Sequence, residues 1–265
     1  MALSATALKQ IRSLQTTKGR REQGCFLIEG EKLVREAVTT GAPIRELLAE
    51  EAVLPALRGL GLDVPTTPVS ARDAARLAGT KTPQGWFAVV ADEVPSAATA
   101  IDRLPAEGGL TVVALDGVQD PGNAGALIRV AAAFRVALVL AGPGTADPVH
   151  PKVVRAATGA WFQVPIARSE DLAADLETLR SRGFSLLGAL PAGDSLYDAP
   201  REERCVLVLG SEGGGFSPPV SAMLERALSV PIAPGVESLN VAVAAGIVLG
   251  EWERARAMDG VRCGS

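Results

Sequence analysis

The sequence is poor in the residues from which many active sites are built. It contains a single histidine, His150, which argues against a histidine-based catalytic triad and against a metal site of several histidines. Its three cysteines, Cys25, Cys205 and Cys263, are odd in number and far apart, so neither a zinc-ligand spacing nor a disulfide framework is visible. This use of cysteine is typical of a reducing compartment, and we expect a cytoplasmic protein without a bound metal.

Long apolar runs and an excess of positive charge are absent as well. No apolar stretch is long enough to cross a membrane, and the first residues lack the unbroken apolar core of a secretory signal. The formal net charge is −4, so no overall field attracts nucleic acid, although a local basic patch remains compatible with that average. With 48% hydrophobic and 21% charged residues, the composition is that of an ordinary soluble globular protein, and we expect no membrane partner.

The length of 265 residues suggests two domains or one large one, and the pattern of strands and helices favours two. Residues 1–91 alternate short apolar runs with helical patterns, which predicts a small α/β domain. Residues 92–109 are rich in proline, alanine and glycine without a clean period, and we interpret them as a linker. In residues 110–265 the strands are continuous apolar runs, so we expect a parallel sheet with helices on both faces and a long last helix over 238–258.

Basic residues gather near the N-terminus, with few acids between them: Lys9, Arg12, Lys18, Arg20 and Arg21. A run of charges usually marks a solvated helix face. In a net-acidic chain, however, a local excess of this kind is equally compatible with contacts to phosphate groups of a nucleic acid. Both interpretations stay open at this point.

The first of three polar corners lies between a strand and a helix at residues 116–129. Asn123 can act as the N-cap of that helix, which would explain it without any function. Arg129 is harder to explain, because its helical neighbours at three and four positions are all glycine or alanine. A guanidinium on a face of small residues needs a polar or anionic partner, so Arg129 is a candidate functional residue, with a structural ion pair as the alternative.

The second corner is the glycine-rich loop at residues 210–215, which follows an apolar strand and holds Glu212 among its glycines. A carboxylate competes for the backbone N–H groups that would bind a phosphate, and the lysine of a phosphate-binding loop is absent. The loop also lies late in the chain, whereas a dinucleotide fingerprint belongs to the first strand–helix unit. We expect a ligand without phosphate, one with positive charge being the best match; the alternative is a tight turn with Glu212 facing solvent.

The third corner, residues 235–240, precedes the last helix and carries Ser238 and Asn240 on either side of Leu239. Either polar side chain can cap the helix, which would account for one of them. Two such side chains at a helix start, where the positive end of the helix dipole points, indicate a place that holds a polar or anionic group.

Taken in order, the three corners resemble the motifs of a known family. Residues 123–129 have the form Asn, five residues, Arg; residues 209–213 match a Gly-Ser/Ala-Glu-Gly signature; Val-Pro-Ile at 230–232 and Ser-Leu-Asn-Val at 238–241 match the third motif. In this order and spacing they are similar to the SpoU (TrmH-type) family of RNA 2′-O-ribose methyltransferases, in the SPOUT superfamily. Glu237 departs from that family's pattern, which has serine there. The resemblance covers the whole chain, and the N-terminal part looks like a ribosomal-protein-type RNA-binding domain.

The resemblance implies a catalytic α/β domain with a deep trefoil knot and S-adenosyl-L-methionine as cofactor. From their places in the motifs, it implies functional roles for five polar residues: Asn123, Arg129, Glu212, Ser238 and Asn240. It implies cofactor contacts, mostly through the backbone, at Gly210, Val230, Ile232 and Leu239, with Leu190 at the adenine pocket. The resemblance further implies a homodimer through the knotted domain, with Arg129 near the partner's cofactor, and an RNA partner rather than DNA.

We therefore expect 2′-O-methylation of a ribose in RNA. The basic N-terminal cluster and the long first domain are similar to the ribosomal-RNA members of the family, and methylation of transfer RNA is the nearest alternative. Two alternatives come from other classes, a non-catalytic RNA-binding protein and a dinucleotide-dependent oxidoreductase. The intact polar set argues against the first, and Glu212 with the late glycine loop argues against the second.

Overall fold

The computed structural model describes residues 3–80, 82–199 and 202–262, and the chain divides into two compact units. Unit 1 comprises residues 1–93 together with 149–163, and unit 2 comprises residues 94–148 together with 164–265. The chain therefore passes between the units three times. The segment 149–163, which separates two strands of unit 2, belongs to unit 1.

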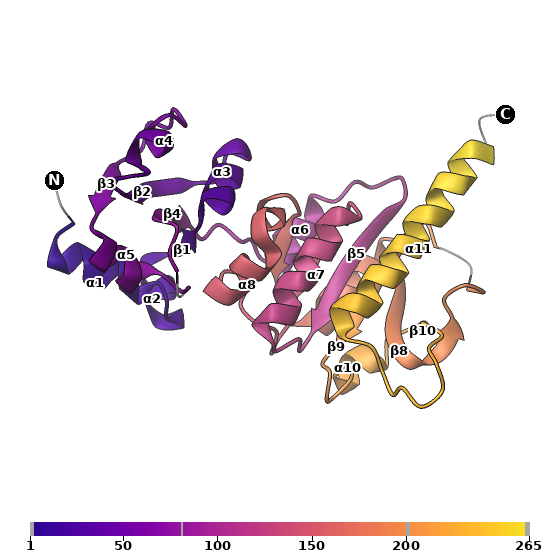
Figure 1. The fold of residues 1–265 in the computed structure, drawn as a ribbon. Coiled ribbons are helices and arrows are strands. Elements are labelled where there is room, and N and C mark those ends of the chain that lie inside the picture. Colours follow the sequence, from indigo (N-terminus) through magenta and orange to yellow (C-terminus); the bar gives the residue numbers. More distant parts are fainter. Residues whose placement is uncertain (1–2, 81, 200–201, 263–265) are drawn as a thin grey trace. The chain divides into compact units, whose positions relative to one another are not determined.

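Unit 1 is built on a mixed four-stranded sheet (Figure 1) with the strand order β1-β4-β2-β3, antiparallel except for the pair β2/β3. Its strands are β1 (Cys25–Glu29), β2 (Ile44–Glu50), β3 (Thr66–Val69) and β4 (Trp86–Ala91). Its N-terminal helices are α1 (Ala5–Ser13), α2 (Thr17–Gln23), α3 (Glu31–Thr39), α4 (Leu54–Arg58) and α5 (Ala71–Leu77). Helix α8 (Pro151–Ala157) and the short 3₁₀ helix η1 (Thr158–Phe162) come from the second half of the chain.

The segment 149–163 is packed into unit 1 through apolar and close backbone contacts. Helices α1 and α5 contribute to a core with Leu27 and Phe87 of the sheet. The neighbouring residue Phe26 points to the opposite face, as alternation along a strand requires, and its ring centroid lies 5.0 Å from that of Trp161 in η1. At Gly159 a Cβ atom would lie 2.8 Å from the Cγ atom of Glu36 in α3, so η1 and α3 approach closely.

Unit 2 contains a six-stranded sheet with the order β10-β8-β9-β5-β6-β7, in which every strand pair is parallel. Its strands are β5 (Leu110–Asp116), β6 (Leu138–Ala141), β7 (Ile166–Arg168), β8 (Ser185–Ser195), β9 (Arg204–Gly210) and β10 (Arg226–Ser229). Its helices are α6 (Ala97–Asp102), α7 (Pro121–Ala133), α9 (Leu172–Ser181), α10 (Pro218–Ser221) and α11 (Val241–Arg262).

Helices cover both faces of this parallel sheet, as the apolar strand pattern predicts. Helices α7 and α11 lie side by side across one face (Figure 1), and α11 also contacts β9. On the other face, α6, α9 and α10 form a core with alternate residues of the central strands, among them Val112 and Val206. The prediction of a parallel α/β sheet buried on both faces is confirmed. Among the described residues, no helix is long and apolar enough to span a membrane.

The structure differs from the expected linker at residues 92–109. Ser96 caps α6, whose residues Ala97, Ala100 and Ile101 are buried in the core of unit 2. Because α6 has only six residues, its apolar positions are too few to show a helical period in the sequence. The last helix begins at Val241, three residues later than expected, so residues 238–240 precede it as irregular chain that can line a cavity.

Candidate functional site

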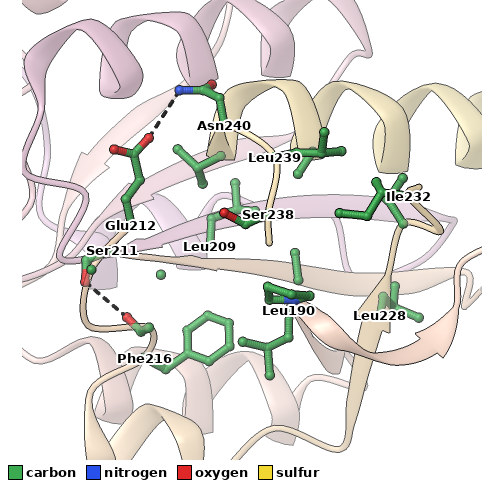
Figure 2. Close-up of a pocket in the computed structure, with 18 residues that line it drawn as sticks. Leu190, Leu209, Ser211, Glu212, Phe216, Leu228, Ile232, Ser238, Leu239 and Asn240 are labelled. Carbon is green, nitrogen blue, oxygen red and sulfur yellow. Dashed lines mark hydrogen bonds between the residues drawn. The ribbon is translucent and has the colours of Figure 1, made fainter. Parts of the chain in front are cut away.

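A cavity of about 550 Å³ lies in unit 2, beside the carboxyl end of β9 (Figure 2). Four stretches that are far apart in the sequence contribute residues to its wall: 189–191, 209–216, 228–232 and 238–244. The parallel strands bring these stretches to one edge of the sheet, which is where open α/β sheets bind ligands. The second and third polar corners of the sequence therefore face the same space.

All five residues expected to contact a cofactor line this cavity: Leu190, Gly210, Val230, Ile232 and Leu239. Three of them, Leu190, Ile232 and Leu239, present aliphatic side chains to it (Figure 2). Gly210 contributes backbone only. The structure thus brings the five together, while their contact with a cofactor stays a prediction.

The glycine-rich loop folds back on itself over Gly210. Ser211 and Gly215 exchange two backbone hydrogen bonds of 3.0 Å, and Gly215 has φ +64°, a conformation that favours glycine. A Cβ atom on Gly210 would lie 2.5 Å from the carbonyl oxygen of Gly215 and 3.0 Å from the ring of Phe216. Only glycine fits at position 210, because any side chain would force the loop open.

Three of the expected functional side chains meet at the rim of the cavity. The Asn123 Nδ2 atom donates to Glu212 Oε1 at 2.6 Å, and Asn240 Nδ2 donates to the same oxygen at 3.2 Å. Asn240 Nδ2 also lies 2.9 Å from Asn123 Oδ1. One carboxylate therefore joins residues from all three polar corners, and the alternative of a Glu212 that only faces solvent is wrong. Ser238 lines the same cavity (Figure 2).

The N-terminal caps of α7 and α11 explain how the side chains of Asn123 and Asn240 are oriented. Asp120, not Asn123, caps α7: its Oδ1 atom accepts from the backbone N–H groups of Gly122 (2.7 Å) and Asn123 (3.0 Å). Asn123 thus lies inside the first turn, with its side chain available to Glu212. Asn240 both caps α11 and joins the network with Glu212. Its Oδ1 atom accepts from Ala242 N at 3.0 Å, while its amide nitrogen donates to the network.

Two contributors to the site, Asp120 and Phe216, were not singled out in the sequence. The signal for Asp120 is present, since Asp followed by Pro at the first helical position marks a helix start. Phe216, which lines the cavity, has no sequence signal, because an aromatic residue after a glycine loop is more often part of a core.

Arg129 lies apart from this network. It is six residues beyond Asn123 on α7, which places it about 9 Å along the helix and about 120° around it. The side chain is exposed and is not among the residues that line the cavity. Within the part of the chain that the structure describes, its guanidinium has no hydrogen bond or ion pair, so the alternative of a structural ion pair is not supported.

The prediction that Arg20 belongs to the RNA-binding cluster is wrong. Lys9, Arg12, Lys18 and Arg21 are exposed on α1 and α2, but Arg20 is only 1% exposed. The Arg20 guanidinium donates to the carbonyl oxygens of Leu14 (3.3 Å) and Gln15 (3.5 Å) at the end of α1. A cation at a helix C-terminus stabilises the helix dipole, so Arg20 is a structural residue of unit 1.

The single histidine and the described cysteines lie outside the cavity. His150 caps α8 in unit 1, where its Nδ1 atom accepts from Lys152 N at 3.2 Å. Burial raises the pKa of the Cys25 thiol in β1, and the charge of nearby Arg45 opposes this only in part. Cys205 is buried in β9, and Cys263 lies outside the described residues. No group of three or more potential metal ligands occurs among the described residues.

Comparison with known proteins finds a matching family for each of the two parts of the chain. The sequence profile of the SpoU rRNA Methylase family matches residues 110–250, and that of the MRM3-like substrate binding domain matches residues 5–88. The 23S rRNA (guanosine(2553)-2′-O)-methyltransferase RlmP of Bacillus subtilis is 34% identical over 250 residues, which cover 91% of this chain and 94% of RlmP.

Solved structures of two further proteins share the architecture. The SpoU methyltransferase AviRb from Streptomyces viridochromogenes, in complex with AdoMet, has a TM-score of 0.87 and 26% identity, covering 96% of this chain and 98% of AviRb. An AdoMet-bound rRNA methyltransferase from Sinorhizobium meliloti has a TM-score of 0.85 and 27% identity, with coverage of 96% and 98%. Both similarities extend over unit 1 and unit 2.

Proposed function

The chain belongs to the SpoU rRNA methylase family and is an RNA methyltransferase that uses S-adenosyl-L-methionine, and we propose that it methylates the 2′-hydroxyl group of a ribose in ribosomal RNA. The observation that carries this proposal is the network in which Glu212 joins Asn123 and Asn240 at the rim of the cavity. The relative RlmP, matched over nearly the whole of both chains, supports ribosomal RNA as the substrate class.

The cavity fits the cofactor by its size and by its donor set. Its volume of about 550 Å³ falls within the range of small-molecule sites, about 300–1,000 Å³. Its wall combines aliphatic side chains with the backbone of residues 209–216, and its rim carries the carboxylate of Glu212. Together these groups suit a positively charged ligand that carries no phosphate. Bound S-adenosyl-L-methionine supplies an electrophilic methyl group on a positively charged sulfur.

The residues of this chain have to orient a ribose and allow its 2′-hydroxyl group to lose a proton. In-line approach of the ribose oxygen is mainly a positioning problem, to which the amides of Asn123 and Asn240 and the hydroxyl of Ser238 contribute. Arg129 stays protonated to very high pH, so it does not act as a simple base. Instead it holds the adjacent phosphate and stabilises the developing alkoxide, while the proton passes to the phosphate or to a water molecule.

The position of Arg129 supports a homodimer in which it serves the partner's site. Arg129 is exposed on α7 and turned away from the network of its own chain, and Val243 on the adjacent helix α11 is 51% exposed. A self-complementary contact through these two helices would cover this surface and complete each site with the partner's arginine. The proposed dimer predicts twice the chain mass in light scattering, and a monomeric mass at working concentration contradicts it.

We further propose that unit 2 carries the trefoil knot of its family and that unit 1 selects the RNA. The exposed side chains of Lys9, Arg12, Lys18 and Arg21 form a patch suited to phosphate contacts. Replacing two of these four residues by alanine should weaken RNA binding and lower the salt dependence of the affinity by about two counter-ions, with unchanged affinity for S-adenosyl-L-methionine. An unchanged salt dependence would contradict a role for the patch.

The activity is tested with the full-length protein, radiolabelled S-adenosyl-L-methionine and total RNA from cells that lack the gene. We expect label in large ribosomal RNA at a nucleotide whose 3′ linkage becomes resistant to alkali, because methylation removes the 2′-oxygen as internal nucleophile. Label on a base, which leaves the linkage sensitive to alkali, contradicts 2′-O-methylation. Label confined to transfer RNA contradicts the substrate class. Calorimetric binding of NAD in place of S-adenosyl-L-methionine would support the oxidoreductase alternative.

A further inference from the structure

Asp116 is a buried carboxylate beside the cavity that the proposed methyl transfer does not use. It is the last residue of β5, and it is 6% exposed. Aspartate is seldom buried to this extent unless its charge is met by hydrogen-bond donors. In the register of β5 and β9, Asp116 lies opposite Gly210, where the cavity loop begins.

The partner of Asp116 is a backbone amide at the other end of that loop. The N–H group of Ser217 donates to Asp116 Oδ2 at 2.6 Å, which is short for a bond between an amide and a carboxylate. Ser217 precedes α10, a helix of only four residues, and its own side chain makes no capping hydrogen bond. One helical turn has little stability of its own, so the carboxylate is the main polar anchor of this end.

Both ends of the loop 210–217 are thus fixed to one residue. The first end, Gly210, is held beside Asp116 by strand pairing, and the second, Ser217, is held by the Asp116 side chain. Between them, Phe216 packs across Gly210 and Gly188, with ring atoms 3.0 and 2.9 Å from the sites where Cβ atoms would be. Glu212, which organises the two asparagines, lies between these two fixed ends.

We propose that Asp116 is a positioning residue that clamps residues 210–217 in the conformation that binds S-adenosyl-L-methionine. Without the clamp the loop loses its second attachment, and Phe216 and the loop backbone no longer form a fixed wall of the cavity. Cofactor affinity therefore falls, whereas methyl transfer at saturating cofactor changes less. This inference rests on the proposed function of the cavity as the cofactor site.

Substitutions at two positions separate the hydrogen bond from the residues that make it. Asp116→Ala removes the acceptor. Ser217→Pro removes the N–H donor together with the hydroxyl group, and Ser217 already has φ −61°, the angle that a proline ring imposes. Ser217→Ala keeps the N–H group and is the matched control. Asp116→Asn keeps an acceptor oxygen and is the conservative rescue.

Calorimetry with S-adenosyl-L-methionine on each full-length variant is the decisive measurement, with thermal unfolding alongside. We expect the Kd to rise about tenfold in Asp116→Ala and in Ser217→Pro, as loss of a buried bond to a charged group implies. The double variant should bind no worse than either single variant, because one bond is lost in each. Ser217→Ala and Asp116→Asn should stay within about twofold of the wild type.

An affinity loss in Ser217→Ala equal to that in Ser217→Pro, additive losses in the double variant, or an unchanged Kd in Ser217→Pro overturns the proposal. If Asp116→Ala does not fold, the comparison of Ser217→Pro with Ser217→Ala decides alone. A wild-type protein that does not bind S-adenosyl-L-methionine refutes the proposed function instead, so the two failures are distinct.

Discussion

Replacement of Arg129 by alanine should abolish most of the activity without touching the fold. The side chain is exposed and has no partner among the described residues of its own chain, so its loss removes no internal contact. We expect the free energy of unfolding to change by less than about 0.5 kcal/mol, as for other surface substitutions. If Arg129 stabilises the developing alkoxide, kcat should fall about 100- to 1,000-fold, which corresponds to about 3–4 kcal/mol.

The assay is steady-state methyl transfer at saturating RNA and cofactor, with calorimetry of S-adenosyl-L-methionine and thermal unfolding on the same preparations. Arg103→Ala is the matched control, because Arg103 is also exposed in unit 2 and its side chain has no hydrogen bond or ion pair among the described residues. A variant at position 129 that binds RNA and retains near-normal turnover would refute the reasoning. A large loss of stability would contradict the statement that the Arg129 side chain makes no stabilising contact within its own chain.

Co-expression of two inactive variants tests whether Arg129 acts across subunits. A chain with Arg129→Ala keeps its cavity, and a chain with Gly210→Ala keeps its arginine. If the arginine serves the partner's cavity, half of the randomly formed dimers contain one intact site, and activity returns to about a quarter of the wild-type value. If it serves its own cavity, the mixture stays inactive.

Three further predictions follow from the contacts described for the site and for unit 1. Glu212→Ala should lower kcat/KM about tenfold or more, measured by methyl transfer, because both asparagine amides lose their common acceptor. Gly210→Ala should weaken cofactor binding strongly in calorimetry, because its Cβ would lie 2.5 Å from a loop carbonyl oxygen. Arg20→Ala should destabilise unit 1 by about 2–3 kcal/mol in denaturant unfolding, whereas Arg12→Ala should leave stability unchanged and weaken RNA binding.

The parallel sheet of unit 2 was predictable because its strands are buried on both faces and therefore read as unbroken apolar runs. The residues at the rim of the site could be predicted from the sequence, but the contacts between them could not. Sequence order places Asn123 and Asn240 in separate corners, and only the folded sheet shows that Glu212 joins them. The separation of Arg129 from this network follows from helix geometry, since six residues are neither a whole number of turns nor one face.

Other features depend on contacts that no local pattern encodes. Arg20 and Arg21 are neighbours in a basic run, yet one is buried and the other exposed, because the close approach of Gly19 to the end of α1 fixes which side of α2 faces inward. Likewise, α6 is too short to show a period, and its burial becomes visible only with the core that it joins. The membership of residues 149–163 in unit 1 is a long-range property of the same kind.

If unit 1 selects the RNA, as proposed, the placement of residues 149–163 also limits how substrate choice can be exchanged between relatives. A chimera that replaces residues 1–93 by a foreign N-terminal segment leaves Trp161 facing a surface that did not evolve with it, in place of Phe26. Gene fusion at a single boundary therefore transplants an incomplete module. Retargeting the enzyme requires two coordinated replacements, and in natural descent the two segments are expected to change together.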